Sequence, residues 1–125
     1  MNTNRRSFIE QCGLLTGAAI WGHTHALGQA EGKRKRIAFL GTEVRQHSHS
    51  QHFLDRLALG YGWRGGWQEP RTSIASIYID QFPEKGDLGR DRVKRYGFKL
   101  YPNIEQALTL GSGNLAVAGV VIIAD

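Results

Sequence analysis

The stretch that most constrains the fold runs from residue 36 to residue 61, and it reads as a buried strand, a polar turn and an amphipathic helix. Residues 37–40 (IAFL) form an unbroken apolar run, as a parallel strand covered on both faces requires. Gly41 then allows a sharp turn. Ser48 predicts a helix N-cap, with Gln51 at the third helical position of a capping box. The apolar face of this helix is predicted to carry Phe53, Leu54, Leu57, Ala58 and Tyr61.

Strands and helices alternate along the rest of the chain. Further strands are predicted at residues 73–80, 98–101 and 116–124, and further helices after caps at Asp87 and Asn103. This alternation predicts an α/β fold, a Rossmann-like parallel sheet of about four strands with flanking helices. The junction of first strand, turn and capped helix could hold an anion, because backbone N–H groups and the helix dipole converge there.

The segment of residues 62–71 contains three glycines and a proline, and we expect no regular structure in it. Its two tryptophans, Trp63 and Trp67, are expected to fold back over the end of the first helix. The alternative is that they form a stacking surface for a ligand or partner.

The first thirty residues resemble a twin-arginine signal peptide and are excluded from the fold. The motif is NRRSFI at residues 4–9, followed by a mildly apolar segment and small residues that predict cleavage after Ala30. The apolar segment is too short to span a membrane. The only cysteine, Cys12, would leave with the leader. The predicted organisation is therefore a signal peptide at 1–30 and one domain at 31–125, located in the periplasm or secreted.

Charge gives little indication of function. The net charge of +5 falls to +4 without the leader, and four of the positive residues lie together at 33–36, as in a solvated tail. We therefore predict no nucleic-acid role.

The sequence ends at Asp125, at the tip of the last predicted strand. In open α/β sheets the ligand crevice lies beyond the carboxyl ends of the strands. We therefore expect this chain to be a truncated or degraded copy of a longer gene.

Three stretches resemble the N-terminal domain of the Gfo/Idh/MocA oxidoreductases, the glucose–fructose oxidoreductase and inositol dehydrogenase group. Residues 36–41 (RIAFLG) are similar to that family's opening strand and first glycine, and residues 77–80 (IYID) to its second strand with a terminal acid. Residues 91–108 (DRVKRYGFKLYPNIEQAL), leading to 120–124, are similar to the following helix, short strand, helix and strand.

This resemblance implies a Rossmann domain that binds NAD or NADP. Carried over by position, Gly41, Thr42 and Asp80 are the expected cofactor contacts. Asp80 matches the acid that hydrogen-bonds the ribose hydroxyls of NAD and disfavours the 2′-phosphate of NADP. A second interpretation of Asp80, equally open, is a turn or helix-capping residue.

The glycine motif departs from the family pattern. Glu43 and Gln46 stand where the second and third glycines of G-x-G-x-x-G belong. A glutamate brings bulk and negative charge towards a pyrophosphate, and Gln46 is expected to push the helix away from the strand. The family's catalytic lysine follows the next strand, beyond Asp125, so we assign no catalytic residue.

Three histidines, His47, His49 and His52, cluster at the start of the first helix. Their spacing could hold zinc with Glu43 or Asp55 as a fourth ligand. Under the predicted cap, however, His47 and His52 occupy the two positions of a hydrophobic staple and His49 faces solvent. A capping role, an anion or substrate contact, and a metal site all remain open.

Three functions are compatible with these patterns. The first is the dinucleotide-binding half of an exported oxidoreductase, with a sugar or polyol substrate in a full-length form and no complete catalytic site in this chain. The second is a non-catalytic Rossmann-like binding module with a degenerate nucleotide site. The third is a metal-dependent protein built on the histidines.

Overall fold

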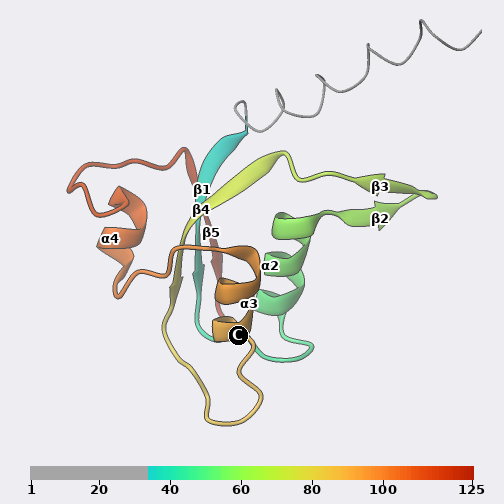
Figure 1. The fold of residues 1–125 in the computed structure, drawn as a ribbon, viewed down its shortest axis with the longest axis horizontal. Coiled ribbons are helices and arrows are strands. Elements are labelled where there is room, and N and C mark those ends of the chain that lie inside the picture. Colours follow the sequence, from blue (N-terminus) through green and yellow to red (C-terminus); the bar gives the residue numbers. More distant parts are fainter. Residues whose placement is uncertain (1–33) are drawn as a thin grey trace, which may run out of the picture. The chain divides into compact units, whose positions relative to one another are not determined.

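The computed structural model describes residues 34–125, which form an α/β unit (Figure 1). The predicted signal peptide at 1–30 lies outside the described residues. In chain order the elements are β1 (Lys35–Gly41), α2 (His49–Leu59), β2 (Tyr61–Trp63), β3 (Gly66–Gln68), β4 (Thr72–Ile79), α3 (Gly89–Tyr96), α4 (Ile104–Thr109) and β5 (Gly119–Ile123). Across residues 34–125, no helix has the length and apolar content needed to cross a bilayer.

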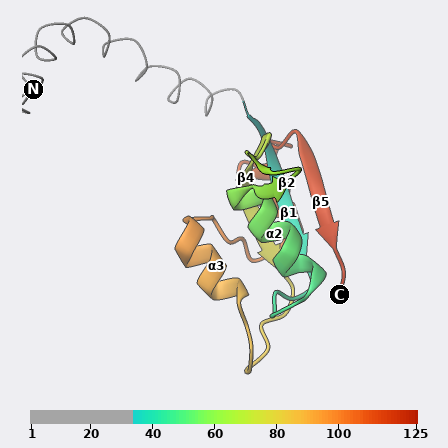
Figure 2. The ribbon, with the colours of Figure 1, turned by 90° about the vertical axis from the view of Figure 1, so that its right-hand side faces the viewer.

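A three-stranded parallel sheet of order β4-β1-β5 forms the centre of the unit (Figure 2). Strand β1 pairs with β4 from Lys35 to Gly41 and with β5 from Ile37 to Gly41. The α/β class and the parallel direction of these strands are therefore confirmed. The expected number of strands, about four, is wrong because the sheet of the described residues has three.

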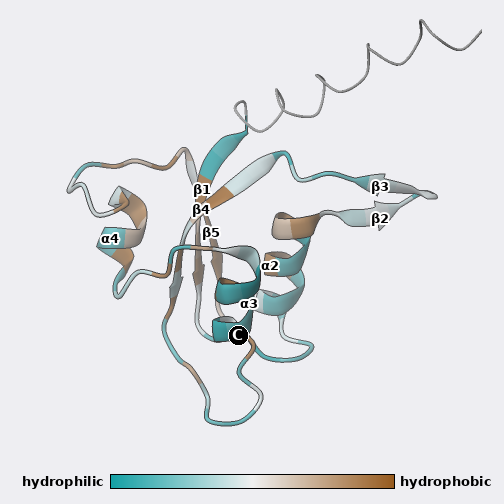
Figure 3. Cartoon of the chain, in the orientation of Figure 1, coloured by the Kyte–Doolittle hydropathy of each residue, from teal (hydrophilic) through white to brown (hydrophobic). Residues whose placement is uncertain are grey.

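Strand β1 is buried because helices pack over it on both faces of the sheet, although Val120 and Ile122 of β5 stay exposed on the α4 side. Phe39 faces α2 and α3 in one core, while Ala38 and Leu40 face α4 in the other, as the two-residue alternation of a strand requires. Ala38 and Phe39 are fully buried. Figure 3 shows apolar stretches along the strands of the parallel sheet and hydrophilic residues over most of α3. The apolar run at 37–40 therefore forms the covered central strand that its pattern predicted.

The predicted strand at 98–101 is reduced to a single bridge between Leu100 and Ile77. The Ile77 N–H donates to the Lys99 carbonyl at 2.9 Å, and the Tyr101 N–H donates to the Ile77 carbonyl at 2.8 Å. Pro102 follows at once and has no N–H to extend the ladder. This segment lies against β4 but is too short to become a fourth strand.

The segment at 62–71 is not irregular, contrary to the prediction. It contributes most of an antiparallel hairpin of β2 and β3, which extends away from the parallel sheet (Figure 1). Its two-residue loop, Arg64 and Gly65, has φ of 49° and 77°. Positive φ at both loop residues matches the right-handed twist of hairpin strands. The glycines that suggested a coil therefore make a tight turn.

The two tryptophans of the hairpin are largely exposed, at 60% for Trp63 and 59% for Trp67. Trp67 does lie against the end of α2, since a side chain at Gly60 would come within 2.9 Å of its indole nitrogen. The Trp63 ring instead lies beneath the Arg64 guanidinium, with 5.8 Å between the ring centre and Arg64 Cζ. The expected folding back thus describes Trp67 only.

The apolar face predicted for α2 is also narrower than expected. Leu54 is fully buried and Leu57 packs beside it, whereas Phe53 and Tyr61 are 47% and 45% exposed. Tyr61 lies outside the helix because Gly60, with φ of 95°, ends it.

Asn103 caps α4 as predicted, since its side chain accepts from the Gln106 N–H at 2.8 Å. The predicted cap at Asp87 is wrong by one residue, because the N-cap of α3 is Leu88, which makes no side-chain cap hydrogen bond. The Asp87 carboxylate does accept from the Gly89 N–H at 2.8 Å. Gly97 ends α3 in the left-handed conformation, with φ of 70°.

A polar clamp joins α2 to α3. Asp55 accepts two hydrogen bonds from Arg92, at 2.8 and 3.1 Å, and one from the Tyr96 hydroxyl at 2.8 Å. Burial alone would raise the pKa of Asp55, but the bonds from Arg92 and Tyr96 outweigh it and lower that pKa. The bidentate geometry gives this pair more energy than an exposed ion pair has.

We expect Asp55→Ala to lower the free energy of unfolding by about 2 kcal/mol, because Arg92 and Tyr96 lose a shared acceptor in a half-buried site. Urea unfolding at neutral pH measures the change. Asp91→Ala is the matched control. It also removes a partner of Arg92, but an exposed one, and should cost less than about 0.5 kcal/mol. Equal losses in the two variants would contradict the clamp.

Candidate functional site

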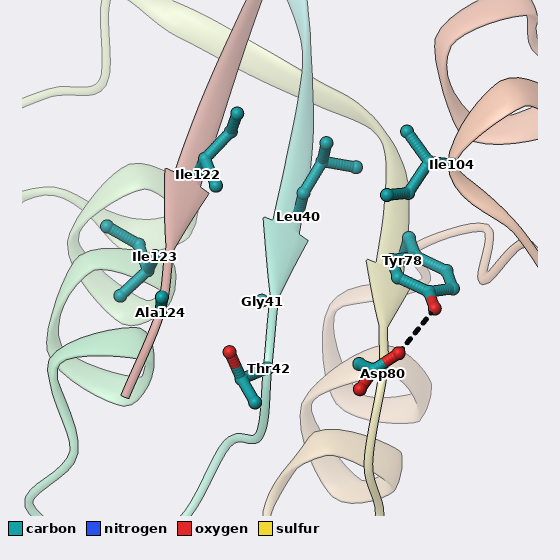
Figure 4. A pocket seen from close by; sticks show the side chains of 9 residues that line it. All are labelled: Leu40, Gly41, Thr42, Tyr78, Asp80, Ile104, Ile122, Ile123 and Ala124. Atoms are coloured by element: carbon teal, nitrogen blue, oxygen red, sulfur yellow. Dashed lines mark hydrogen bonds between the residues drawn. The ribbon is translucent and has the colours of Figure 1, made fainter.

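The carboxyl ends of the three parallel strands meet at one edge of the sheet, where open α/β sheets bind ligands. A hollow of about 240 Å³ lies there (Figure 4). Its lining comes from all three strands and from α4: Leu40, Gly41, Thr42, Tyr78, Asp80, Ile104, Ile122, Ile123 and Ala124. The structure thus brings the three predicted cofactor contacts, Gly41, Thr42 and Asp80, to one place.

Backbone hydrogen bonds hold the floor of the hollow. The Asp80 N–H donates to the Gly41 carbonyl at 3.0 Å, and the Gln81 N–H donates to the Thr42 carbonyl at 2.7 Å. The Thr42 N–H donates to the Ile123 carbonyl at 3.2 Å. These bonds continue the sheet one step past the strand ends, so the residues around the hollow are fixed relative to one another.

Asp80 presents its carboxylate at the rim of the hollow and does not cap a helix, because α3 begins only at Gly89. One of its oxygens accepts from the Tyr78 hydroxyl at 2.7 Å, and the other lies 3.4 Å from the Gln81 amide nitrogen. The hydrogen bond to Asp80 is the main cause of the raised pKa of Tyr78. The helix-capping interpretation of Asp80 is therefore wrong, whereas the turn interpretation agrees with the bend that Asp80 forms directly after β4. Tyr78, which orients the carboxylate, was missed by the sequence patterns.

Gly41 is needed for packing rather than for an unusual backbone angle. Its φ is not positive, and a side chain there would come within 3.1 Å of the Phe39 ring and 3.4 Å of the Ser50 hydroxyl. The missing side chain lets α2 approach β1 closely.

The expectation that Gln46 would push α2 away from β1 is wrong. Residues 42–48 form a longer loop in which Gln46 is exposed, and the contact with β1 falls instead to the small, fully buried Ser50. Val44 anchors this loop in the core, and its carbonyl accepts from the Leu88 N–H at 2.8 Å. Glu43 pairs with Arg45, which offsets part of its negative charge.

Ser48 caps α2 as predicted, since its hydroxyl accepts from the Gln51 N–H at 3.1 Å. The other half of the capping box is displaced by one residue. The Gln51 side-chain oxygen accepts from the His47 N–H at 2.6 Å, while the Ser48 N–H is held by the Arg45 carbonyl. His47 reaches this position through a left-handed backbone, with φ of 66°.

The three histidines of this region do not converge. The rings of His47 and His52 lie 6.4 Å apart at an angle of 40°, in the arrangement of a local staple. The His49 ring is turned instead towards Asp125. Within residues 34–125, no three histidine, cysteine or acidic side chains form a group that could hold a metal ion. The geometry therefore gives the metal interpretation no support.

The predicted anion position at the N-terminus of α2 holds a carboxylate of the chain itself. Asp125 accepts from the backbone N–H of His49 at 3.1 Å and of Ser50 at 3.0 Å, and lies 3.0 Å from His49 Nδ1. Burial alone would raise the pKa of Asp125. Hydrogen bonds from Ser50 and His49 outweigh burial and hold the pKa at about 2. No sequence signal linked Asp125 to this helix, because 75 residues separate it from Ser50.

Comparisons with known proteins do not identify the chain: no protein-family model, no curated protein and no solved structure matches it. The interpretation of the site therefore depends on its geometry.

We expect Asp125→Ala to lower the free energy of unfolding at neutral pH by about 1 kcal/mol, because α2 loses a charged acceptor at its N-terminus. The folded-state pKa of about 2 lies below the ordinary value of 3.8. The carboxylate therefore stabilises the fold above about pH 4, and its contribution disappears as the pH falls towards 2.

Urea unfolding across this pH range tests the assignment. Glu84→Gln, which removes an exposed carboxylate from the loop before α3, is the control and should leave stability unchanged. A loss in Asp125→Ala that stays constant down to pH 2 would show that the charge of Asp125 is not its source.

Proposed function

We propose that residues 34–125 bind the nucleoside part of a dinucleotide in the hollow, with NAD preferred to NADP. The observation that carries this proposal is the position of Asp80. Its carboxylate ends the strand next to β1 and lies at the rim of the hollow beside Gly41 and Thr42. In dinucleotide-binding sheets an acid at this position accepts hydrogen bonds from both ribose hydroxyls and repels a 2′-phosphate.

The shape and lining of the hollow support the same ligand class. Leu40, Ile104 and Ile122 give it apolar walls on which a base can lie, and Asp80 and Thr42 supply polar groups at one end. Its volume of about 240 Å³ is below that of a typical pocket for a whole drug-sized ligand. A nucleoside portion fits this volume better than a complete dinucleotide does.

The broader proposal is the one that the family resemblance suggested, the cofactor-binding half of an exported oxidoreductase. NAD would supply the hydride chemistry, while this chain's residues bind and orient it. We assign no described residue to catalysis. The sugar or polyol substrate, and export by the twin-arginine route, remain predictions.

A non-catalytic binding module is the second candidate, and the carboxylate of Asp125 favours it. In dinucleotide-binding sheets the N-terminus of the first helix receives the pyrophosphate. Here Asp125 already takes two of the N–H groups at that position. A scaffold that has lost its dinucleotide would tolerate this arrangement.

Titration calorimetry with NAD and NADP tests the leading proposal. We expect Asp80→Asn to weaken NAD binding by about tenfold, the effect of losing charge-assisted hydrogen bonds to the ribose. We also expect the preference for NAD over NADP to shrink, because the repulsion of the 2′-phosphate is removed.

Glu84→Gln is again the matched control, since it removes one acidic charge outside the hollow and should leave both affinities unchanged. The proposal fails if Asp80→Asn binds NAD as tightly as the unaltered chain. The second candidate gains if neither nucleotide binds nor raises the melting temperature.

A further inference from the structure

Four polar groups converge at the N-terminus of α2, and we call them the cradle: the backbone N–H groups of His49 and Ser50, the His49 imidazole and the Ser50 hydroxyl. Three of the four lie within hydrogen-bonding distance of the Asp125 carboxylate, at 3.0 to 3.1 Å. The side chain of Asp125 is only 5% exposed, so the carboxylate occupies the cradle rather than passing near it.

Asp125 is not needed as the cap of α2, because Ser48 already fills that role. The Ser48 hydroxyl accepts from the Gln51 N–H, and the Ser48 carbonyl accepts from the His52 N–H at 3.2 Å. Asp125 is therefore an additional anion on a helix that has its own cap. Its low pKa keeps it ionised at neutral pH.

The fourth group of the cradle points to a ligand other than a carboxylate. The Ser50 hydroxyl is fully buried and has no hydrogen-bond partner among the described residues. It faces Asp125 closely enough to contribute to the lowered pKa of that carboxyl, but not in hydrogen-bonding geometry. A buried hydroxyl without a partner is costly, and such a group in a native structure indicates a missing partner.

The unpaired hydroxyl fits a tetrahedral anion better than a planar carboxylate. The two oxygens of Asp125 face the His49 and Ser50 N–H groups, and in this orientation neither forms a hydrogen bond with the Ser50 hydroxyl. A tetrahedral group offers at least one oxygen more, out of that plane, for the Ser50 hydroxyl. The small side chain of Ser50 and the bare Gly41 leave this side of the cradle next to the end of β1.

We propose that Asp125 is a resident stand-in for a phosphate group, and that a phosphate-bearing ligand must displace it to occupy the cradle. This inference rests on the proposed nucleotide site and adds a control to it. Asp125 directly follows Ala124, which lines the hollow. When the Asp125 carboxylate leaves the cradle, the neighbouring wall of the hollow moves with it. Ligand binding in the hollow and release of Asp125 from the cradle are therefore coupled.

The coupling also predicts weak binding by the unaltered chain. When a site is open for only a fraction of the time, its apparent affinity falls by that fraction. Repulsion between Asp125 and an incoming anion acts in the same direction.

Inorganic pyrophosphate is the probe, because it contains the phosphate groups without the nucleoside and so does not depend on Asp80. We expect Asp125→Ala to bind pyrophosphate at least about tenfold more tightly than the unaltered chain in titration calorimetry. Adding Ser50→Ala to that variant should reverse about fivefold of the gain, the effect of one hydrogen bond. Glu84→Gln controls for the change in net charge and should bind as the unaltered chain does.

Equal affinity of folded Asp125→Ala and the unaltered chain would overturn the inference, as would a gain that Glu84→Gln reproduces. If Asp125→Ala does not fold, amide NMR of the unaltered chain replaces the comparison. Pyrophosphate must then shift the His49 and Ser50 amide signals together with the Asp125 carboxyl carbon. Amides that stay unmoved at saturating pyrophosphate would refute displacement.

The two proposals fail in different ways. If NAD binds in a manner that depends on Asp80, but Asp125→Ala does not change pyrophosphate or NAD affinity, the stand-in is refuted and the nucleotide site remains. If Asp125→Ala gains pyrophosphate affinity while NAD never binds, the cradle is supported and the dinucleotide proposal fails.

Discussion

The pairing of β1 with a parallel strand on each side is the interaction on which the rest of the structure depends. It makes β1 the covered centre of the sheet, with Ala38 and Phe39 fully buried on opposite faces. A strand in this position needs apolar residues on both faces, because each face packs against helices. The same pairing brings three strand ends to one edge of the sheet. The candidate site is therefore a direct consequence of how the core is formed.

Close packing of α2 on β1 places the N–H groups of the helix N-terminus beside the carboxyl ends of the strands. Gly41 has no side chain and Ser50 has a small one, so the N-terminus of α2 lies next to the end of the central strand. A helix start in this position gathers N–H groups whose partial positive charge attracts an anion. The loop at 42–48 joins β1 to α2 without a G-x-G-x-x-G motif, and the buried side chain of Val44 fixes this loop in the core.

Two kinds of acid meet at this edge and have different environments. Asp80 is exposed at the rim of the hollow, and its nearest hydrogen-bond partner is the Tyr78 hydroxyl. The Asp125 side chain is buried against backbone donors. The first is available to a ligand, whereas the second already acts as one. The carboxyl ends of the strands therefore present one carboxylate that is exposed and one that α2 already holds.

Much of the fold was predictable because its signals are local. The apolar run at 37–40, the Ser48 and Asn103 caps and the Gly97 stop each depend on interactions within a few residues. The meeting of Gly41, Thr42 and Asp80 was also predictable, since parallel strands place their carboxyl ends together. The hairpin at 61–68 was missed because glycine is typical of coils and of tight hairpin loops alike. The predicted strand at 98–101 shrinks to a single bridge at Leu100. How far this segment pairs with β4 depends on tertiary packing, which local sequence patterns do not record.

The sequence by itself therefore determined the order of elements, the central strand and the acid beside it, because hydrophobic period and capping act over short distances. Only the tertiary structure decided what occupies the N-terminus of α2. Ser50 and Asp125 are far apart in the chain and meet only when β5 pairs with β1. A helix start attracts any anion within reach, and the fold decides which one that is.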